Sequence, residues 1–370
     1  MSKAILFTGS FQYGVVADFI QGIAQSLHHQ GYQVQQINLS EKSSLQQQLT
    51  AETFRGTELV FSVNALGADL LPYFAELRQV PFYSLLLDHP LHSLLRFFGT
   101  PLRLLCVDQA HVAFARAVGM QAEFCPHAIS AAQVSLTASP DTAKQGILFP
   151  ASFFSADKAK TIIDQHFPQA WNWLRNPAVR TISDFLYQLG FMQAGKKPLL
   201  ELNKNTITIL CHCDFYLRAI GRDRLLQQFA DAGLALQVIG NGWEQAQQLP
   251  QHQYLPAVAF PALLQMMQKV RYVLHHSPGF EAGLHERLLY PIGAGTQVLS
   301  EPTPYLEQVF TRGGAVRFFN HAAELSPALA TVSAADYQSQ LVHSQQLLKQ
   351  QHSWDVRLQP WLLPQKPQTI

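Results

Sequence analysis

Over the first 130 positions, short apolar runs alternate with segments whose apolar residues recur every three to four positions. The first such segment places Val16, Ile20, Ile23 and Leu27 on one helical face. Strands are predicted over 4–9, 32–39, 58–65, 80–88, 104–109 and 122–128. Strands that alternate with helices are typical of a parallel sheet covered on both faces, so residues 1–145 predict an α/β domain.

The same alternation returns in the second half of the chain. Strands are predicted over 206–214, 234–244, 270–278 and 295–301, and helices over 222–233, 261–270 and 304–310. Residues 205–335 therefore predict a second α/β domain. Residues 146–204 have helical spacing without the strand pattern and predict a linking or inserted helical segment. Residues 336–370 predict a polar helix and tail, which could pack back on the first domain.

The predicted fold class is α/β, with two doubly wound, Rossmann-like domains that face each other across a cleft. Open sheets of this kind bind ligands at the carboxyl ends of their strands. The arrangement suits an enzyme that joins a nucleotide-linked group to a second substrate. It equally suits a receptor that closes on a small molecule, and topology alone leaves both open.

Composition narrows the possible partners. The 370 residues are 48% hydrophobic and 14% charged, which is typical of a packed globular protein long enough for two domains. A net charge of +1 provides no basic excess for nucleic acid. No apolar run reaches the ~18–20 residues of a membrane span, and the N-terminus lacks a signal-peptide pattern. With only four cysteines, we expect a reduced, cytoplasmic protein.

Residues 275–295, HHSPGFEAGLHERLLYPIGAG, contain histidines and carboxylates that invite a metal-site interpretation. His285 and Glu286 begin an HExxH pattern, but Leu289 stands where the second histidine is required. Cys211-His212-Cys213 has no second ligand pair nearby and is interpreted as part of a strand. The chain also has no D-x-D sequence. We therefore expect no metal and no other cofactor.

A phosphate site is the better interpretation of this stretch. The Ser/Pro/Gly loop follows a buried strand and precedes a helix, and a helix N-terminus offers unpaired N–H groups to an anion. Glu286, in the first helical turn, could accept hydrogen bonds from sugar hydroxyls. It could equally be a carboxylate that only favours the helix dipole, and spacing alone does not decide.

Several sequence blocks resemble one family. The order SPGFEAGLHERLLYPIGAGTQVLSEPTPYLEQVF, the upstream block DFYLRAIGRDRLLQQFADAGLALQVIGNGWE and the downstream His352-Ser353-Trp354 with Arg357 are similar to blocks of GT-B glycosyltransferases. The resemblance is greatest to the CgeB-like, spore-maturation-type group and covers about residues 205–360. It implies a GT-B fold and a nucleotide-sugar donor on the C-terminal domain. It implies no requirement for a divalent ion.

The resemblance also implies roles for residues of the C-terminal domain. Glu286 would bind the ribose, while His285 and the backbone of Gly283 and Leu284 would meet the diphosphate. Arginine forks suit phosphate. The implied donor-binding residues are Arg218, Arg222, Gly240, Gly242, Trp243, Ser277, Gly283, Leu284, His285 and Glu286, of which Gly240, Gly242 and Trp243 line the base pocket.

One departure bears on mechanism. Many retaining GT-B enzymes carry two glutamates eight positions apart, whereas Glu281 and Glu286 here are five apart and Tyr290 stands where the second glutamate is expected. We therefore expect inversion, which needs a base to deprotonate the acceptor hydroxyl. The candidates follow the apolar strand 80–88 and are Asp88, His89 and His92, although Asp88-His89-Pro90 could equally be a simple turn. Asp108 and His127 are further polar residues at predicted strand ends.

The sequence thus predicts a metal-independent glycosyltransferase that moves a sugar from a nucleotide-sugar to a hydroxyl of a polysaccharide, lipopolysaccharide, other lipid-linked or protein acceptor. A sugar-nucleotide epimerase of GT-B fold and a non-catalytic two-domain binding protein are the alternatives. The donor sugar, the nucleobase and the oligomeric state are not predicted.

Overall fold

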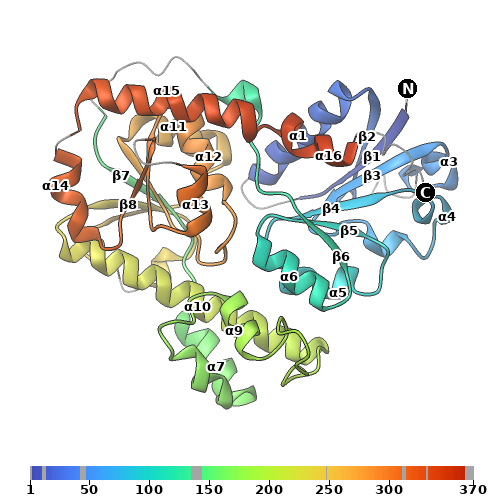
Figure 1. The fold of residues 1–370 in the computed structure, drawn as a ribbon, viewed down its shortest axis with the longest axis horizontal. Helices are drawn as coiled ribbons and strands as arrows, with labels where there is room; N and C mark the ends of the chain where they lie inside the picture. Colours follow the sequence, from blue (N-terminus) through green and yellow to red (C-terminus); the bar gives the residue numbers. More distant parts are fainter. Residues whose placement is uncertain are drawn as a thin grey trace. The chain divides into compact units, whose positions relative to one another are not determined.

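A computed structural model describes residues 2–10, 14–41, 47–134, 144–246, 248–310, 314–330 and 332–362. The chain forms two compact units, which are shown in Figure 1. Unit 1 comprises residues 1–131 and 349–370, and unit 2 comprises residues 132–348.

Unit 1 is built on a six-stranded parallel sheet with the order β2-β1-β3-β4-β5-β6. Its strands are β1 (Ser2–Thr8), β2 (Tyr32–Asn38), β3 (Thr57–Val63), β4 (Phe82–Leu86), β5 (Arg103–Cys106) and β6 (Gln121–Phe124). Its helices are α1 (Val15–His29), α3 (Ala51–Phe54), α4 (Ala75–Arg78), α5 (Leu94–Phe97), α6 (Gln109–Ala117) and α16 (Trp354–Leu362). The predicted apolar runs become the largely buried strands β1, β3, β4 and β5, because a parallel strand covered on both faces has no solvent side. The edge strands β2 and β6 are more exposed.

Helix α16 brings distant sequence back into unit 1. Trp354 is buried against α1, where its ring lies 5.7 Å from that of Phe19. Gly22 makes room for it, since a Cβ at that position would approach the Trp354 ring to 2.2 Å. Ile129 forms a parallel bridge with Ser353 beside this contact. The core of unit 1 therefore includes residues that follow all of unit 2 in the sequence.

Unit 2 contains the second six-stranded parallel sheet, with the order β12-β11-β10-β7-β8-β9. Its strands are β7 (Ile147–Pro150), β8 (Leu236–Ile239), β9 (Gln253–Leu255), β10 (Tyr272–His275), β11 (Gln297–Ser300) and β12 (Val316–Phe318). Numbered along unit 2, this is the 3-2-1-4-5-6 order of a Rossmann sheet. The order reverses between β7 and β10, which is where such sheets bind ligands.

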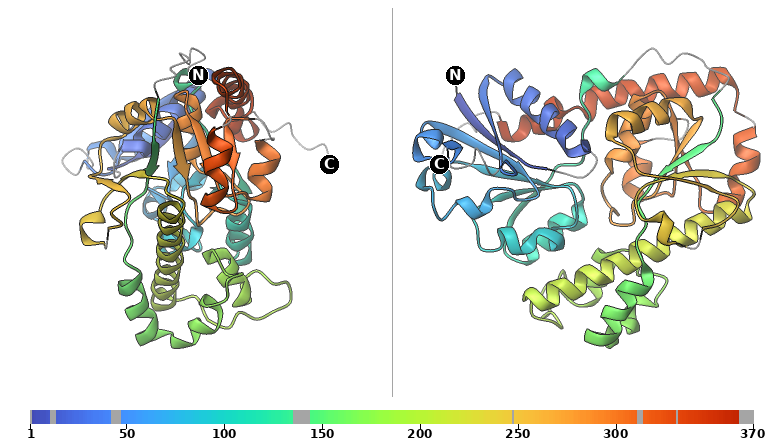
Figure 2. Two further views of the ribbon diagram at one scale, coloured as in Figure 1. Left: turned by 90° about the vertical axis from the view of Figure 1, so that its left-hand side faces the viewer. Right: turned by 180° about the vertical axis from the view of Figure 1, so that it is seen from behind.

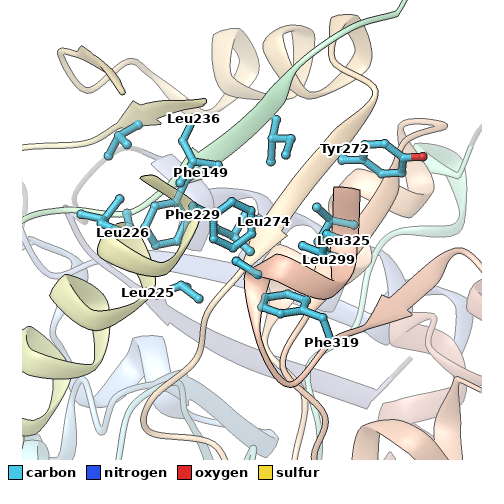
Figure 3. Close-up of a cluster of buried hydrophobic side chains, with 14 of the residues drawn as sticks. Phe149, Leu225, Leu226, Phe229, Leu236, Tyr272, Leu274, Leu299, Phe319 and Leu325 are labelled. Carbon is cyan, nitrogen blue, oxygen red and sulfur yellow. The ribbon is translucent and has the colours of Figure 1, made fainter. Parts of the chain in front are cut away.

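Helices of unit 2 cover the sheet and extend beyond it. They are α7 (Ala156–His166), α8 (Trp171–Leu174), α9 (Ile182–Gln188), α10 (Lys204–Asp231), α11 (Phe260–Lys269), α12 (Glu286–Gly293), α13 (Pro304–Val309), α14 (Leu325–Ala330) and α15 (Ala334–Gln351), whose last residues enter unit 1. Figure 3 shows the core between the sheet and the C-terminal half of α10, where Phe149, Phe229 and Leu274 interlock.

The N-terminal half of α10 leaves the sheet and packs against α7 and α9. Figure 2 shows these helices as a projection from unit 2. The prediction of a strand over 206–214 was wrong. Asn203 caps the helix by accepting from the Thr206 N–H at 3.0 Å, and Ile207, Leu210, Cys213 and Leu217 are buried at helical spacing. The β-branched composition favoured a strand, but burial along one helical face prevailed.

The predicted fold class is confirmed, since both units are doubly wound parallel α/β structures. Within the predicted helical segment, α7 to α9 are helical, but residues 147–150 form the central strand β7. Unit 2 accordingly starts at residue 132 rather than 205. Four buried residues are too short a run to stand out in the sequence. Of the predicted tail, residues 363–370 lie outside the described part of the chain.

Candidate donor site in unit 2

Two arginines meet at the point where the strand order of unit 2 reverses. Arg222, from α10, donates to the carbonyl oxygen of Ser152, just beyond β7. Arg287, from the first turn of α12, donates to the carbonyl oxygen of Pro150 at 3.0 Å. Both guanidinium groups are therefore held by backbone carbonyls, which carry no full negative charge to compensate theirs.

Arg222 is buried, and its guanidinium lies 5.1 Å from the centre of the Phe154 ring. Burial, followed by the nearby charges of Arg287 and Arg218, lowers its pKa from 12.5 to about 9. Within the described residues, its Nε has no hydrogen-bond partner and no carboxylate forms an ion pair with it. A bound anion would relieve the cost of this buried, clustered charge.

Arg218 lies one helical turn earlier on α10 and is better compensated. Its Nε lies 2.8 Å from Oδ2 of the fully buried Asp214. Its Nη2 packs against the loop after β10, where a Cβ on Gly279 would come within 3.2 Å of it. The ion pair with Asp214 thus holds the Arg218 guanidinium against the backbone of this loop.

The loop 276–285 ends at the N-terminus of α12, where His285 is the N-cap residue. Its Nδ1 lies 3.2 Å from the Arg287 backbone nitrogen and 2.6 Å from Glu286 Oε2. The first contact needs a lone pair on Nδ1 and the second needs a proton, so they alternate with the protonation of this nitrogen. Glu286 is buried beside these groups, with its Oε1 3.9 Å from Arg287 Nε.

A cavity of about 750 Å³ opens at the carboxyl ends of β10 and β11. It falls within the range of small-molecule sites. Of the predicted donor residues, Ser277, Gly283 and His285 line it. Further walls come from α10, from the segment before α13 and from residues 174–181 between α8 and α9, so the inserted helical segment contributes directly to the site.

The other predicted donor residues occupy different positions. Leu284 is buried beside the cap. Gly240 follows β8, where a Cβ would come within 2.2 Å of the Ala151 carbonyl oxygen, so only glycine fits. Gly242 has a φ of 86° at the start of the next turn. Trp243 is buried in the core, and its Nε1 donates to the Ala151 carbonyl at 2.7 Å. These three residues join the loops after β7 and β8, while a role in base binding stays a prediction.

Tyr290, which replaces the expected second glutamate, is a core residue of α12. It is buried, and its ring lies 4.8 Å from that of Phe260 in an edge-to-face arrangement. The substitution therefore replaces a carboxylate with an aromatic ring that packs against α11.

In unit 1, the predicted catalytic residues follow β4 and differ in exposure. Asp88 is exposed and His92 is half-buried. His89 is buried, its Nδ1 accepts from the Leu91 N–H at 3.2 Å, and its ring packs edge-to-face on that of His111.

Two further polar residues at strand ends of unit 1 are also buried. Asp108 caps α6 by accepting from the Ala110 N–H at 2.7 Å. His127 is buried with its ring 5.5 Å from that of Phe19. Both residues thus contribute to the packing of unit 1.

Sequence reasoning missed Arg287, Arg224 and Glu301. Arg224 Nη2 lies 2.8 Å from Glu301 Oε1, and both residues line the cavity. Arg287 stands directly after the predicted His285-Glu286 pair, and Glu301 directly follows a strand, so their positions were signals. Among the described residues, no group of His, Cys, Asp and Glu could hold a metal ion, and no helix has the length and apolarity to cross a membrane.

Comparisons with known proteins agree with this architecture. Residues 218–362 match a family model described as glycosyl transferase-like. Anabaena HepE in complex with UDP-glucose is a similar structure, with a TM-score of 0.53, 11% identity and 98% of each chain covered. AviGT4, a glycosyltransferase involved in avilamycin A biosynthesis, has a TM-score of 0.55, 12% identity and coverage of 98% of this chain and 96% of its own.

Sucrose-phosphate synthase from Thermosynechococcus elongatus is also similar, with a TM-score of 0.50, 11% identity and 97% of each chain covered. A search of curated proteins finds no match. The fold is that of the GT-B glycosyltransferases. The narrower CgeB-like assignment stays a prediction.

Proposed function

We propose that this chain is a glycosyltransferase that takes a sugar from a nucleotide-sugar donor bound in unit 2 and transfers it to an acceptor hydroxyl. The observation that carries this proposal is the pair of carbonyl-anchored arginines, Arg222 and Arg287, at the strand-order reversal. A diphosphate there would receive charge-assisted hydrogen bonds from preorganised guanidinium forks. The glycosyl transferase-like family model overlaps this region, and a UDP-glucose complex of the structurally similar HepE gives further support.

The same arginines suit the chemical step. When the bond between the anomeric carbon and the diphosphate breaks, negative charge grows on the leaving oxygen. Fixed cations and the N-terminus of α12 would stabilise that charge without a metal ion. Metal independence is therefore part of the proposal.

We further propose an inverting displacement, in which a base in unit 1 takes the proton of the acceptor hydroxyl as it attacks. Asp88 and His92 are the candidates. His89 is not a candidate base, because its Nδ1 accepts from the Leu91 N–H and stabilises the turn that follows β4. The acceptor is proposed as a hydroxyl of a carbohydrate, a lipid-linked glycan or a protein.

Thermal denaturation with a panel of nucleotides tests the proposal. UDP, GDP, dTDP and their glucose or mannose conjugates would be added to the full chain, and at least one pair should raise Tm by several degrees, because a ligand of the folded state stabilises it by mass action. Glycosyl transfer would follow as release of nucleoside diphosphate from that conjugate. The proposal fails if no member of the panel changes Tm.

A second test addresses Glu286, for which ribose binding competes with a purely local role. Glu286→Ala should weaken binding of the stabilising nucleotide about tenfold if the carboxylate accepts from the ribose, since hydrogen bonds to charged groups contribute roughly 1.5–3 kcal/mol. Calorimetric titration measures this. Unchanged affinity would show that Glu286 has only a local role in the first turn of α12.

A further inference from the structure

The lining of the unit 2 cavity includes a chain of hydrogen bonds whose direction can be assigned. The Ser300 hydroxyl donates to the Glu301 carbonyl oxygen at 2.9 Å, so Ser300 Oγ can only accept from His275 Nδ1, 3.0 Å away. Burial, with His285 and Arg287 nearby, holds the pKa of His275 well below its usual value, so the ring is neutral. Its Nε2 is then a lone pair, and Ser277 must donate to it at 2.9 Å.

This order has a consequence for any ligand. The only proton of the Ser277 hydroxyl is used within the protein, so Ser277 Oγ offers lone pairs to the cavity. It can accept from a hydroxyl group of a ligand. It cannot donate to a phosphate oxygen, which itself only accepts.

Glu301 provides a second fixed acceptor in the same lining. Arg224 binds its Oε1 at 2.8 Å, and His276 Nδ1 lies 3.3 Å from its Oε2. Burial opposes ionisation, but His276, Arg224 and Arg180 outweigh it and lower the pKa of Glu301. The carboxylate is therefore ionised and held in place, with lone pairs left for a diol. Carboxylate oxygens are acceptors only.

The lining of the cavity is largely apolar. It includes Leu174, Tyr216, Ile220 and Phe280, with four prolines at positions 177, 278, 302 and 304. A lining that combines apolar side chains with fixed hydrogen-bond acceptors suits the C–H and O–H surfaces of a sugar ring.

This cavity is not lined by Arg218, Arg222 or Arg287, the arginines expected to bind the diphosphate. Arg218 packs on Gly279 of the loop after β10, whereas Ser277, Phe280 and Glu281 of the same loop line the cavity. One loop thus contacts the arginine cluster through its glycine and the acceptor-lined cavity through its side chains. Arg175 and Arg180 also line the cavity, but they are exposed.

We propose that this cavity holds the sugar of the donor and that Glu301 and Ser277 select it by accepting hydrogen bonds from its hydroxyl groups. His275 and Ser300 are positioning residues that keep the Ser277 proton turned inward. This inference rests on the proposed donor-binding function and assigns the cavity to a neutral polyhydroxylated group rather than to phosphate.

The test compares each nucleotide with its own sugar conjugate by calorimetric titration of the full chain, using UDP with UDP-glucose, GDP with GDP-mannose and dTDP with dTDP-glucose. For the pair that binds, Glu301→Gln should raise the Kd of the sugar conjugate at least tenfold. It should change the Kd of the free nucleotide by no more than twofold. Glu307→Gln is the matched control, because Glu307 is exposed on α13 and lies outside the cavity lining. It should change neither affinity.

A double-mutant cycle tests the relay. Ser277→Ala should raise the Kd of the sugar conjugate about fivefold and leave the Kd of the free nucleotide unchanged. Ser300→Ala frees His275 to change tautomer and should act in the same direction, but with no further effect in the Ser277→Ala background. A merely structural role of Ser300 would instead give additive losses.

The outcomes separate the two proposals. If the wild-type chain binds none of the nucleotides or conjugates, the proposed function fails and the sugar assignment falls with it. If Glu301→Gln lowers the affinity for the nucleotide and for its sugar conjugate equally, the cavity binds phosphate and only the sugar assignment is overturned. The same conclusion follows if neither affinity changes.

Discussion

At the end of β4 in unit 1 and at the end of β10 in unit 2, the chain carries very similar polar residues. Asp88 and His89 follow the first strand, while His275 and His276 end and follow the second. In unit 1, the histidine is used by the fold, since His89 caps a turn and packs on His111. In unit 2, both histidines hold groups that line a cavity, namely Ser277 and Glu301.

This difference shows that a polar residue at a strand end marks a site only when its hydrogen bonds lead toward a ligand-sized space. In unit 1, the buried side chains of His89 and Asp108 cap the neighbouring backbone. Asp108 is the clearest case, because its carboxylate accepts from the N–H two residues later. Unit 2 instead leaves a buried charge, Arg222, supported by a carbonyl oxygen and the Phe154 ring, without an ion pair to a carboxylate among the described residues.

The largest expected effect tests the unit 1 side of this comparison. Asp88→Asn should lower kcat by roughly 10²–10⁴-fold without changing Tm, because an exposed carboxylate that acts as general base contributes that much. His89→Ala should lower Tm. The readout is the rate of nucleoside diphosphate release from the stabilising donor. A large loss of kcat in His92→Asn, with Asp88→Asn fully active, would move the base to His92.

The next effect tests the buried charge of unit 2. Arg222→Met should weaken nucleoside diphosphate binding about 100-fold, since two charged hydrogen bonds of roughly 1.5 kcal/mol each are lost. Arg222→Lys keeps the positive charge but loses the planar guanidinium fork. Its affinity for the nucleoside diphosphate should lie between those of the wild type and Arg222→Met.

Arg116→Met is the matched control for Arg222→Met. Arg116 Nε also donates to a backbone carbonyl, that of Ala122 in unit 1, at 2.9 Å. Equal losses of nucleotide affinity in the two methionine variants would show that the Arg222 effect is structural.

The smallest effect is a pH dependence of stability centred on His352 in unit 1. Burial, with Arg357 nearby, lowers its pKa from 6.5 to about 3. Between pH 6.5 and about 3, His352 binds a proton in the unfolded chain but not in the folded chain. The folded state therefore has its full stability above pH 6.5 and loses stability as the pH falls toward 3. His352→Asn should flatten the fall by about 2 kcal/mol between pH 6.5 and 5, measured by urea unfolding of unit 1. An unchanged slope would contradict the buried neutral ring.

Much of the fold could be predicted from the sequence, because buried parallel strands and amphipathic helices have distinct periods. The wrong secondary-structure predictions lie where the local sequence pattern does not determine the element that tertiary packing selects. Residues 206–209 are four consecutive β-branched residues, yet Ile207, Leu210 and Leu217 also share a helical face. Strand β7 has only four residues, and its central place in the sheet depends on partners distant in sequence.

The candidate site was predicted unevenly for a similar reason. Ser277, Gly283 and His285 follow one another along a single loop, so one motif identified them together. Arg287, Arg224 and Glu301 work through partners on other elements, and no local pattern shows that Arg224 meets Glu301. Tyr290 was noticed as a missing glutamate, but only its contact with Phe260 shows what replaced it.

The packing of Trp354 against Gly22 affects the order in which the two units fold. During synthesis, α1 emerges early, but the indole that fills its notch follows only after some three hundred further residues. Until then, the surface around Phe19 stays exposed, and unit 2 has the opportunity to fold first. The long chain separation also makes closure of unit 1 a slow, non-local event. Unit 1 would therefore be the later of the two to become resistant to proteases on the ribosome, although its residues 1–131 are the first to be made.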